Sequence, residues 1–361
     1  MIIPVDGAEA GLLGRLARIR EAGDVPLVGD PRWPSAHRDA VNAAAAAAAV
    51  PEGTAWATLT SGSSGAPRIV LRSAASWEDS FAAVGAFLGA GSGDAVALPA
   101  PPASSLTLFS LAHALSGGPR PVPGNAPDAD ALHCTPQALR AVLDAGAPPR
   151  LRAALVGGSH LDPELRRRAE AAGIRVTAYY GAAELSFVAC DEGDGLRPFP
   201  GVEVEIRQGE VWVRSPFTAS GYAGSPGPLR REGAWATVGD RAELIDGRLR
   251  LLGRADDAIL SASATIVPEE VEAALRSIPG VRDALVFGLP RGPVGALVSA
   301  LLELEAGAPV DVRALAADRL APAHRPRRWF TGLIPRTASG KPARAEAPGL
   351  VMAGEVQPLA A

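Results

Sequence analysis

Residues 151–180, LRAALVGGSHLDPELRRRAEAAGIRVTAYY, contain the clearest indication of the fold in this chain. The short apolar stretch at 151–156 predicts a buried strand. Asp162-Pro163 is typical of a helix start, and Gly173 is typical of a helix end. Residues 174–180 then predict the next strand. A strand, a helix and a strand joined by short loops form a right-handed parallel crossover, which indicates an α/β fold.

The pattern changes after this crossover. Residues 202–252 alternate between apolar and polar side chains and contain two turn signals, which predicts a smaller, mostly antiparallel β-rich subdomain. From 267 onward the predicted order is helix, strand, strand, helix, strand, which describes a small α+β domain. We therefore predict an N-terminal domain over 1–255 and a mobile C-terminal domain over 256–350, and we expect residues 348–361 to fray.

Composition narrows the class of protein. A chain of 361 residues with 47% hydrophobic content predicts two globular domains. The net charge of −4 argues against a general nucleic-acid binder, and no apolar segment approaches membrane-spanning length. Cys134 and Cys190 make no disulfide framework, which predicts a cytoplasmic protein. None of the five histidines is spaced from either cysteine as the ligands of a metal site would be.

The run Thr60-Ser61-Gly62-Ser63-Ser64-Gly65-Ala66-Pro67-Arg68 follows a predicted buried strand at 55–59. It offers backbone N–H groups and short hydroxyl side chains to one small volume, which suits a polyphosphate. No Gly-Lys-Ser/Thr closes it, so it is not a Walker A loop. The alternative is a flexible Gly/Ser linker.

A second segment, residues 179–184 (YYGAAE), ends a predicted parallel strand. A tyrosine there could stack on a base, and Gly181 would let the backbone approach a ligand. Glu184 could hold a hard cation such as Mg²⁺ beside phosphates. The alternative is a helix start with a glutamate in its first turn.

In each of three further segments, one polar side chain is a candidate for nucleotide binding or catalysis. Asp240 ends the segment 235–240 after a glycine and could accept two ribose hydroxyls, or it could simply follow a hairpin turn. Arg254, in 253–257, offers a rigid fork of donors to ribose or phosphate. Lys341 lies on a glycine-flanked stretch, 335–344, from which it could neutralise a developing phosphate charge. Taken alone, an exposed surface lysine is the alternative.

In this order and spacing, the five segments resemble those of the adenylate-forming superfamily, which includes acyl-CoA synthetases, peptide-synthetase adenylation domains and luciferases. The resemblance runs from Ala55 to Arg344. The segment 60–68 resembles the family's phosphate loop, with Arg68 in place of lysine, and 180–184 resembles its Tyr-Gly-x-Thr-Glu motif. The resemblance implies an enzyme that activates a carboxylic acid with Mg²⁺ and ATP and transfers the acyl group to CoA.

The resemblance also implies a role for each matched residue. Tyr180 would stack on adenine, Asp240 would bind ribose, and Asp256 would be the hinge about which the small domain rotates. Lys341 and Glu184 would be the catalytic residues, with Glu184 also the Mg²⁺ ligand. The residues implied in nucleotide binding are Thr60, Ser61, Gly62, Ser63, Ser64, Gly65, Arg68, Gly157, Gly158, Tyr180, Gly181, Asp240 and Arg254.

Only 59 residues precede the loop, which looks like the compact actinobacterial-type o-succinylbenzoate–CoA ligases of menaquinone synthesis. The expected partners are therefore a small carboxylic acid, ATP and CoA, with no nucleic acid. Transfer to a carrier-protein thiol or to an amine is an alternative. A relative that binds acyl-AMP without forming it is another.

The chain departs from the family pattern in three places. Ala183 replaces the usual threonine, residues 98–106 lack a histidine, and residues 260–265 lack the glycine that gives pantetheine a path. The last departure bears directly on CoA, since a Cβ there would narrow that path. Arg325, Arg327 and Arg328 could bind the 3′-phosphate of CoA, or they could form a solvated basic patch.

Overall fold

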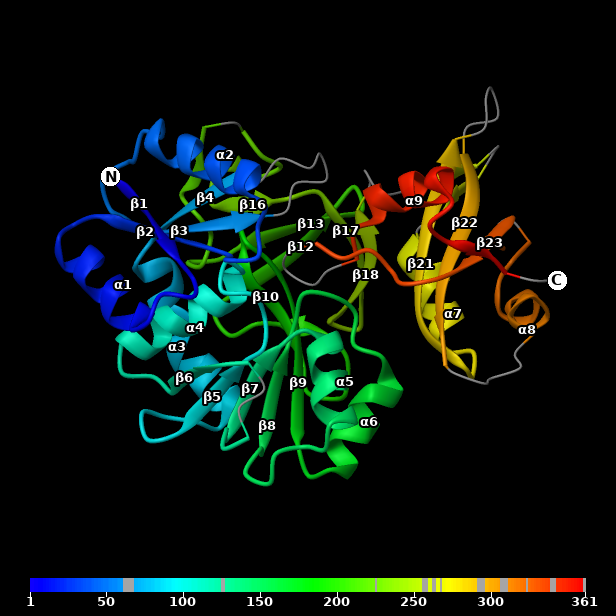
Figure 1. Cartoon of the computed structure of the whole chain (residues 1–361), viewed down its shortest axis with the longest axis horizontal. Coiled ribbons are helices and arrows are strands. Elements are labelled where there is room, and N and C mark those ends of the chain that lie inside the picture. The colour runs from blue at the N-terminus through cyan, green and yellow to red at the C-terminus, as the bar shows by residue number, and fades with distance from the viewer. Residues whose placement is uncertain are drawn as a thin grey trace. The chain divides into compact units, whose positions relative to one another are not determined.

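The computed structural model describes residues 1–60, 68–124, 127–224, 226–254, 259–261, 264–266, 268–290, 296–305, 311–322, 324–337 and 342–359 (Figure 1). The described chain divides into two compact units. The first unit contains residues 1–238 and 244–250. The second contains 239–243, 251–337 and the residues from 342 onward.

The first unit begins with a five-stranded sheet of order β1-β2-β3-β4-β14. β1, β2 and β3 run parallel to one another, whereas β4 is antiparallel to both β3 and β14. The strands are β1 (Ile2–Asp6), β2 (Val25–Gly29), β3 (Thr54–Thr60), β4 (Arg68–Ser73) and β14 (Gly221–Ala223). Helices α1 (Leu12–Glu21) and α2 (Ser35–Ala46) follow β1 and β2.

A seven-stranded sheet of order β11-β10-β9-β8-β7-β5-β6 forms the centre of this unit. Its strands are β5 (Ala95–Leu98), β6 (Arg120–Pro123), β7 (Ala131–Cys134), β8 (Ala153–Val156), β9 (Arg175–Ala182), β10 (Ser186–Asp191) and β11 (Arg197–Pro198). The five neighbouring strands β6, β5, β7, β8 and β9 are parallel. β10 then returns antiparallel to β9.

The predicted crossover is confirmed. β8 and β9 are parallel, with Val156 opposite Ala178, and α6 (Pro163–Ala171) connects them. The Asp162 side chain caps α6 by accepting the Glu164 N–H at 2.9 Å. Gly173, just past the helix, has a φ of 80°, a conformation that favours glycine.

Each face of this sheet is covered by helices (Figure 1). On one face α5 (Pro136–Asp144) and α6 pack Leu139 and Leu165 against Leu132 and Val156 of the strands. Toward the other face α3 (Ala75–Leu88) and α4 (Ser105–Leu115) contribute an aromatic cluster, in which Phe109 packs edge-on against Phe187 at 5.0 Å. The carboxyl ends of the parallel strands remain the natural place for a ligand.

The predicted β-rich region is also confirmed. β12 (Glu203–Arg207) and β13 (Glu210–Arg214) form an antiparallel hairpin, and β16 (Trp235–Thr237) pairs with β13 and β15 (Arg230–Glu232). β17 (Asp240–Ile245) and β18 (Arg248–Arg254) follow, separated by Asp246 and Gly247 with φ of 50° and 73°.

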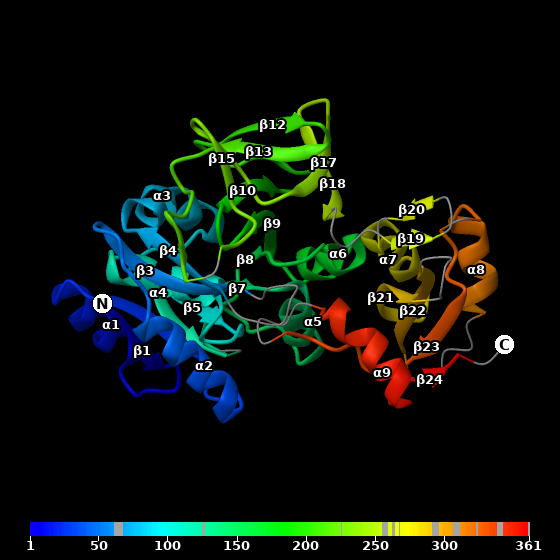
Figure 2. The same ribbon diagram turned by 90° about the horizontal axis from the view of Figure 1, so that it is seen from above.

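The second unit is built on a four-stranded sheet of order β21-β22-β23-β24 (Figure 2). Its strands are β21 (Val281–Pro290), β22 (Ala296–Leu304), β23 (Arg328–Thr331) and β24 (Gln357–Pro358). Helices α7 (Pro268–Arg276) and α8 (Val312–Arg319) cover one face. β19 (Ile259–Ser261) and β20 (Ala264–Ile266) form a separate pair.

The predicted helix and strand order of this unit is confirmed, but the expectation of a frayed end is wrong. The 3₁₀ helix Arg344–Glu346 leads into α9 (Ala347–Ala353), and β24 pairs with β23. Ala347 and Val356 are buried against Phe287 and Phe330, so this short apolar segment gains a packing partner that sequence alone did not reveal.

Within the described ranges, no helix has both the length and the apolar character needed to cross a membrane.

Candidate active site

The first and last residues of the phosphate-loop segment, Thr60 and Arg68, lie opposite each other. Thr60 ends β3, Arg68 begins β4, and they are paired across an antiparallel ladder. Residues Ser61, Gly62, Ser63, Ser64 and Gly65 lie outside the described part of the chain. The segment therefore connects two antiparallel strands, whereas a Walker A loop would lead from a strand into a helix.

Tyr180 lies inside β9, which continues through Gly181 to Ala182, two residues beyond the predicted strand end at Tyr180. β9 pairs with β8 only as far as Ala178, and its last residues pair with β10 instead. A Cβ at Gly181 would lie 2.0 Å from the carbonyl oxygen of Ser186, so the close return of β10 requires glycine here. The strand continues because β10 supplies hydrogen-bond partners that the parallel neighbour no longer offers.

Glu184 lies in the tight turn between β9 and β10, so the alternative of a helix start is wrong. Glu184 is only 4% exposed to solvent. The Tyr222 hydroxyl donates to Glu184 Oε1 at 2.8 Å, and the Ala219 N–H donates to the Glu184 carbonyl at 2.7 Å. The structure therefore holds this buried carboxylate through both its side chain and its backbone.

Arg72, a residue that the sequence analysis missed, lies fully buried beside this turn. Its guanidinium donates to the carbonyls of Ala183 at 2.6 Å, Ser76 at 3.3 Å and Phe217, and it stacks over the Trp77 ring. Burial lowers the pKa of Arg72 to about 9, and the Glu184 carboxylate partly opposes that shift. An arginine within the apolar strand IVLRS was the signal available in the sequence.

Gly157 and Gly158 follow β8 at the carboxyl end of the sheet, as predicted. The Tyr179 ring lies against Gly157, where a Cβ would be 2.1 Å from the ring. The Tyr179 hydroxyl is 3.2 Å from His133 Nε2, and His133 Nδ1 is 2.8 Å from Ser110 Oγ. Burial raises the pKa of Tyr179 and lowers that of His133 to about 3, so this is a neutral polar chain in an aromatic setting.

The other predicted site residues belong to the second unit or are not described. Asp240 begins β17 directly after Gly239, whose φ is 83°. Arg254 is the last residue of β18. Asp256 and Lys341 lie outside the described residues, so their proposed roles stay predictions from the sequence.

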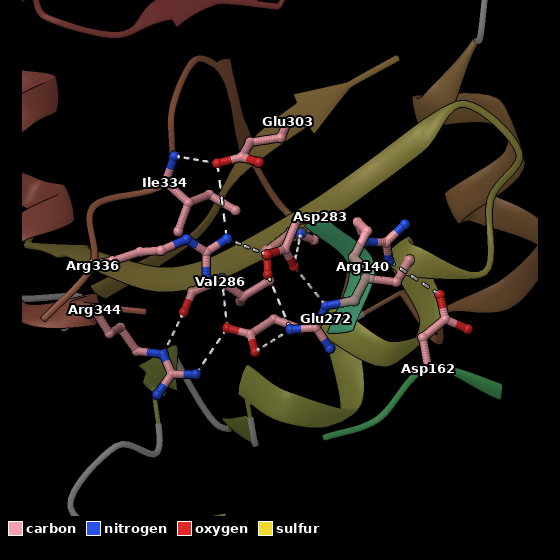
Figure 3. Close-up of polar contacts among 11 residues, drawn as sticks. Arg140, Asp162, Glu272, Asp283, Val286, Glu303, Ile334, Arg336 and Arg344 are labelled. Atoms are coloured by element: carbon pink, nitrogen blue, oxygen red, sulfur yellow. Dashed lines mark hydrogen bonds and ion pairs between the residues drawn. The ribbon is translucent and has the colours of Figure 1, made fainter. Parts of the chain in front are cut away.

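The described residues on both sides of Lys341 are anchored to one ionic network (Figure 3). Arg336 donates to Asp283 at 2.6 Å, and Arg344 donates to Glu272 at 2.8 Å. Arg276 joins the two carboxylates, at 2.9 Å from Asp283 and 3.1 Å from Glu272. Residues near the two ends of the stretch 335–344 are also hydrogen-bonded to each other, because the Ala343 N–H donates to the Pro335 carbonyl at 2.7 Å.

The described residues could bind a magnesium ion only if nucleotide phosphates supplied some of its ligands. No group of three or more His, Cys, Asp or Glu side chains suited to a metal occurs in the described ranges. Tyr222 bonds Oε1 of Glu184, and no described residue bonds Oε2. A single carboxylate oxygen beside nucleotide phosphates is an ordinary setting for Mg²⁺, which keeps most of its other ligands as water or phosphate.

The fold is that of the adenylate-forming superfamily, and the chain belongs to the AMP-binding enzyme family. The family matches residues 17–223, more than half of the chain, and the C-terminal domain of AMP-binding enzymes matches residues 270–341. The predicted fold class, a large N-terminal part with several sheets and a small C-terminal domain, is confirmed.

Among individual proteins, the chain is similar to 2-succinylbenzoate–CoA ligases. It is 30% identical to a probable one from Mycobacterium tuberculosis over 95% of this chain and 96% of that protein. It is 34% identical to the Escherichia coli enzyme over 53% of this chain, but that match spans only 43% of the E. coli enzyme. A solved structure of E. coli MenE with bound OSB-AMS has a TM-score of 0.84 and 25% identity, covering 97% of this chain and 87% of that one.

Proposed function

We propose that this protein is an AMP-forming carboxylic acid–CoA ligase. A carboxylate oxygen of the acid attacks the α-phosphorus of ATP, and the bond to pyrophosphate breaks. The resulting acyl-AMP is then attacked at its carbonyl carbon by the thiol of CoA, which releases AMP. Bound Mg²⁺ would neutralise phosphate charge during the first step.

The observation that carries this proposal is the identity of residue 341. The chain contains 35 lysine and arginine residues, and Lys341 is the only lysine among them. An exposed positive charge can be supplied equally well by arginine, as it is everywhere else in this chain. A compact, flexible ammonium retained at this one position argues for a role that the planar guanidinium does not fill.

The turn at Glu184 supports a nucleotide site in the first unit. The Glu184 carboxylate is buried and held by Tyr222, which lies on β14. β14 pairs with β4, the strand that leaves the phosphate-loop segment. In this unit we assign Glu184 to Mg²⁺ and Tyr180 to adenine. The roles of Asp240 and Arg254, which belong to the second unit, in binding ribose and phosphate rest on the family resemblance. Rotation about Asp256 would remove Lys341 before the second step.

A basic cavity in the second unit favours CoA as the acceptor. It has a volume of about 370 Å³ and is lined by Arg313, Arg327, Arg328, Trp329 and Phe330. None of the three arginines forms an ion pair with a described residue. The predicted cluster is corrected at one position, because Arg325 does not line the cavity and donates to the Leu320 and Ala317 carbonyls. Arg313 and Arg327 donate to the Leu359 and Pro322 carbonyls. Guanidinium groups that lack a carboxylate partner among the described residues and lie beside an aromatic surface suit the 3′-phosphoadenosine end of CoA.

For the acid we propose 2-succinylbenzoate, the substrate in the names of the relatives above, and hence a role in menaquinone synthesis. The two free thiols, Cys134 and Cys190, support a cytoplasmic location, since a reducing compartment keeps such thiols unpaired.

The proposal is tested by pyrophosphate release with 2-succinylbenzoate and a panel of aryl and alkyl acids, with and without CoA. We expect pyrophosphate with at least one acid and the matching acyl-CoA when CoA is added. Adenylation without any thioester would favour a carrier-protein or amine acceptor. No pyrophosphate with any acid would favour a relative that binds acyl-AMP without forming it.

A further inference from the structure

We propose that Tyr222 and Arg72 are positioning residues that hold the Glu184 carboxylate ready for the metal–nucleotide complex. The inference rests on the proposed function, and it assigns two residues to that site from the contacts of the first unit alone.

Tyr222 acts on the side chain of Glu184. Its hydroxyl donates to Oε1 at 2.8 Å and accepts the Leu229 N–H at 3.1 Å, so its direction is fixed from both sides. The ring is fixed too, because it lies where a Cβ at Gly227 would be 2.2 Å away. With Oε1 engaged by Tyr222, Oε2 is the carboxylate oxygen left for a cation.

Arg72 acts on the backbone of the same turn. It holds the Ala183 carbonyl, directly before Glu184, while Ala219 holds the carbonyl of Glu184 itself. The peptide groups on both sides of the Glu184 Cα are therefore fixed. A freely rotating backbone at this point would move the carboxylate even if its rotamer were correct.

The burial of Arg72 argues that this arrangement serves more than packing. A fully buried guanidinium costs several kcal/mol in desolvation unless its donors are satisfied, and here Nε has no partner among the described residues. Arg72 forms no ion pair with a described carboxylate. An apolar side chain would fill this place in β4 at a lower desolvation cost. What Arg72 adds is its hydrogen bonds to the Ala183 and Phe217 carbonyls.

The two residues also connect Glu184 to the strand that leaves the phosphate-loop segment. Arg72 lies on β4, and Tyr222 lies on β14, which pairs with β4 so that Tyr222 is opposite Val70. The Ser220 N–H donates to the Leu71 carbonyl at 2.8 Å. A metal ion shared between Glu184 and nucleotide phosphates would thus be held by parts of one hydrogen-bonded assembly.

The test uses the full chain and binding by calorimetry, without turnover. The probes are a non-hydrolysable ATP analogue (adenylyl imidodiphosphate), with and without Mg²⁺, and AMP, which needs no metal. We compare wild type with Tyr222→Phe and Arg72→Lys. Arg166→Lys is the matched control, because Arg166 also donates to backbone carbonyls, of Val176 at 2.7 Å and Asp191 at 3.0 Å, but away from Glu184.

We expect Mg²⁺ to tighten binding of the analogue to wild type and to the control. In Tyr222→Phe and Arg72→Lys the gain from Mg²⁺ should fall about tenfold, the effect of losing a hydrogen bond that serves a charged group, while AMP affinity is retained. An unchanged gain from Mg²⁺, or an equal loss of AMP affinity, would overturn the positioning role and leave the proposed function standing. Wild type that binds neither nucleotide would overturn both.

Discussion

The ring of Tyr179 lies directly against the backbone of Gly157, so closely that a Cβ added to Gly157 would be 2.1 Å from Tyr179 Cζ. Gly157 follows β8 and Tyr179 lies on the neighbouring β9, at the carboxyl end of the central sheet. The absence of a side chain at one strand end thus determines where the aromatic side chain of the next strand stands.

Gly157→Ala should therefore displace Tyr179 and break its contact with His133. We expect a loss of about 1–3 kcal/mol in the free energy of unfolding, the usual cost of overpacking, together with weaker use of the acid. Urea unfolding and KM for the acid measure the two effects. Gly91→Ala is the control, because a Cβ there meets nothing within 4 Å. Equal behaviour of the two variants would contradict the close packing.

At this site some residues could be predicted from the sequence and others could not. The positions of Gly157, Tyr180 and Glu184 in the fold could be predicted because each lies in or just after a strand that local sequence signals mark. Arg72, Tyr222 and His133 could not, because their importance comes from contacts with residues 23 to 145 positions away in sequence. The sequence shows that an arginine interrupts an apolar strand, but it does not show which carbonyl oxygens accept hydrogen bonds from that arginine.

The fold shows the same division. The β8–α6–β9 crossover was predictable because a cap, a first-turn proline and a terminal glycine mark its helix. The ordered end of the chain was not, since Val356 becomes apolar core only when β24 adds to β23. The antiparallel pairing of β3 with β4 likewise depends on strand neighbours that a local pattern does not specify.

Stability should fall with acid pH partly because of His133. Burial lowers its pKa from 6.5 to about 3, so the unfolded chain binds this proton below about pH 6.5 and the folded chain does not. Proton uptake therefore favours unfolding between these values, by at most about 1.4 kcal/mol per pH unit. Melting temperatures of wild type and His133→Gln between pH 7 and 5 measure this, and we expect the shallower decline in the variant. Parallel curves would show that His133 does not contribute.

Lys341→Ala should abolish acyl-AMP formation while sparing the transfer of ready-made acyl-AMP to CoA. One lost charge contact in such a site costs roughly 10²–10³ in rate, by analogy with a lost oxyanion donor. Lys341→Arg should fail as well, because the chain already uses arginine wherever a positive charge alone is needed. Single-turnover formation of acyl-AMP measures both variants. A wild-type rate in either would contradict the role of this lysine.

Arg328→Ala should raise KM for CoA about tenfold, because one guanidinium contact to a phosphate is lost, and should leave acyl-AMP formation unchanged. Arg319→Ala is the control, since Arg319 is an exposed arginine on α8 outside the basic cavity. Steady-state kinetics with CoA as the varied substrate measure the effect. If both variants use CoA like wild type, the cavity is a solvated basic surface.

The central claim is that the acid is activated as acyl-AMP, and isotope transfer tests it most directly. The acid is labelled with ¹⁸O in its carboxylate and incubated with the protein, ATP, Mg²⁺ and CoA, and the products are weighed by mass spectrometry. Attack of the carboxylate on the α-phosphorus leaves one acid oxygen on that phosphorus when the C–O bond breaks in the second step. The account predicts one ¹⁸O atom in AMP and none in pyrophosphate. Product formation with label in a phosphate released from the γ-position, or with unlabelled AMP, would contradict it.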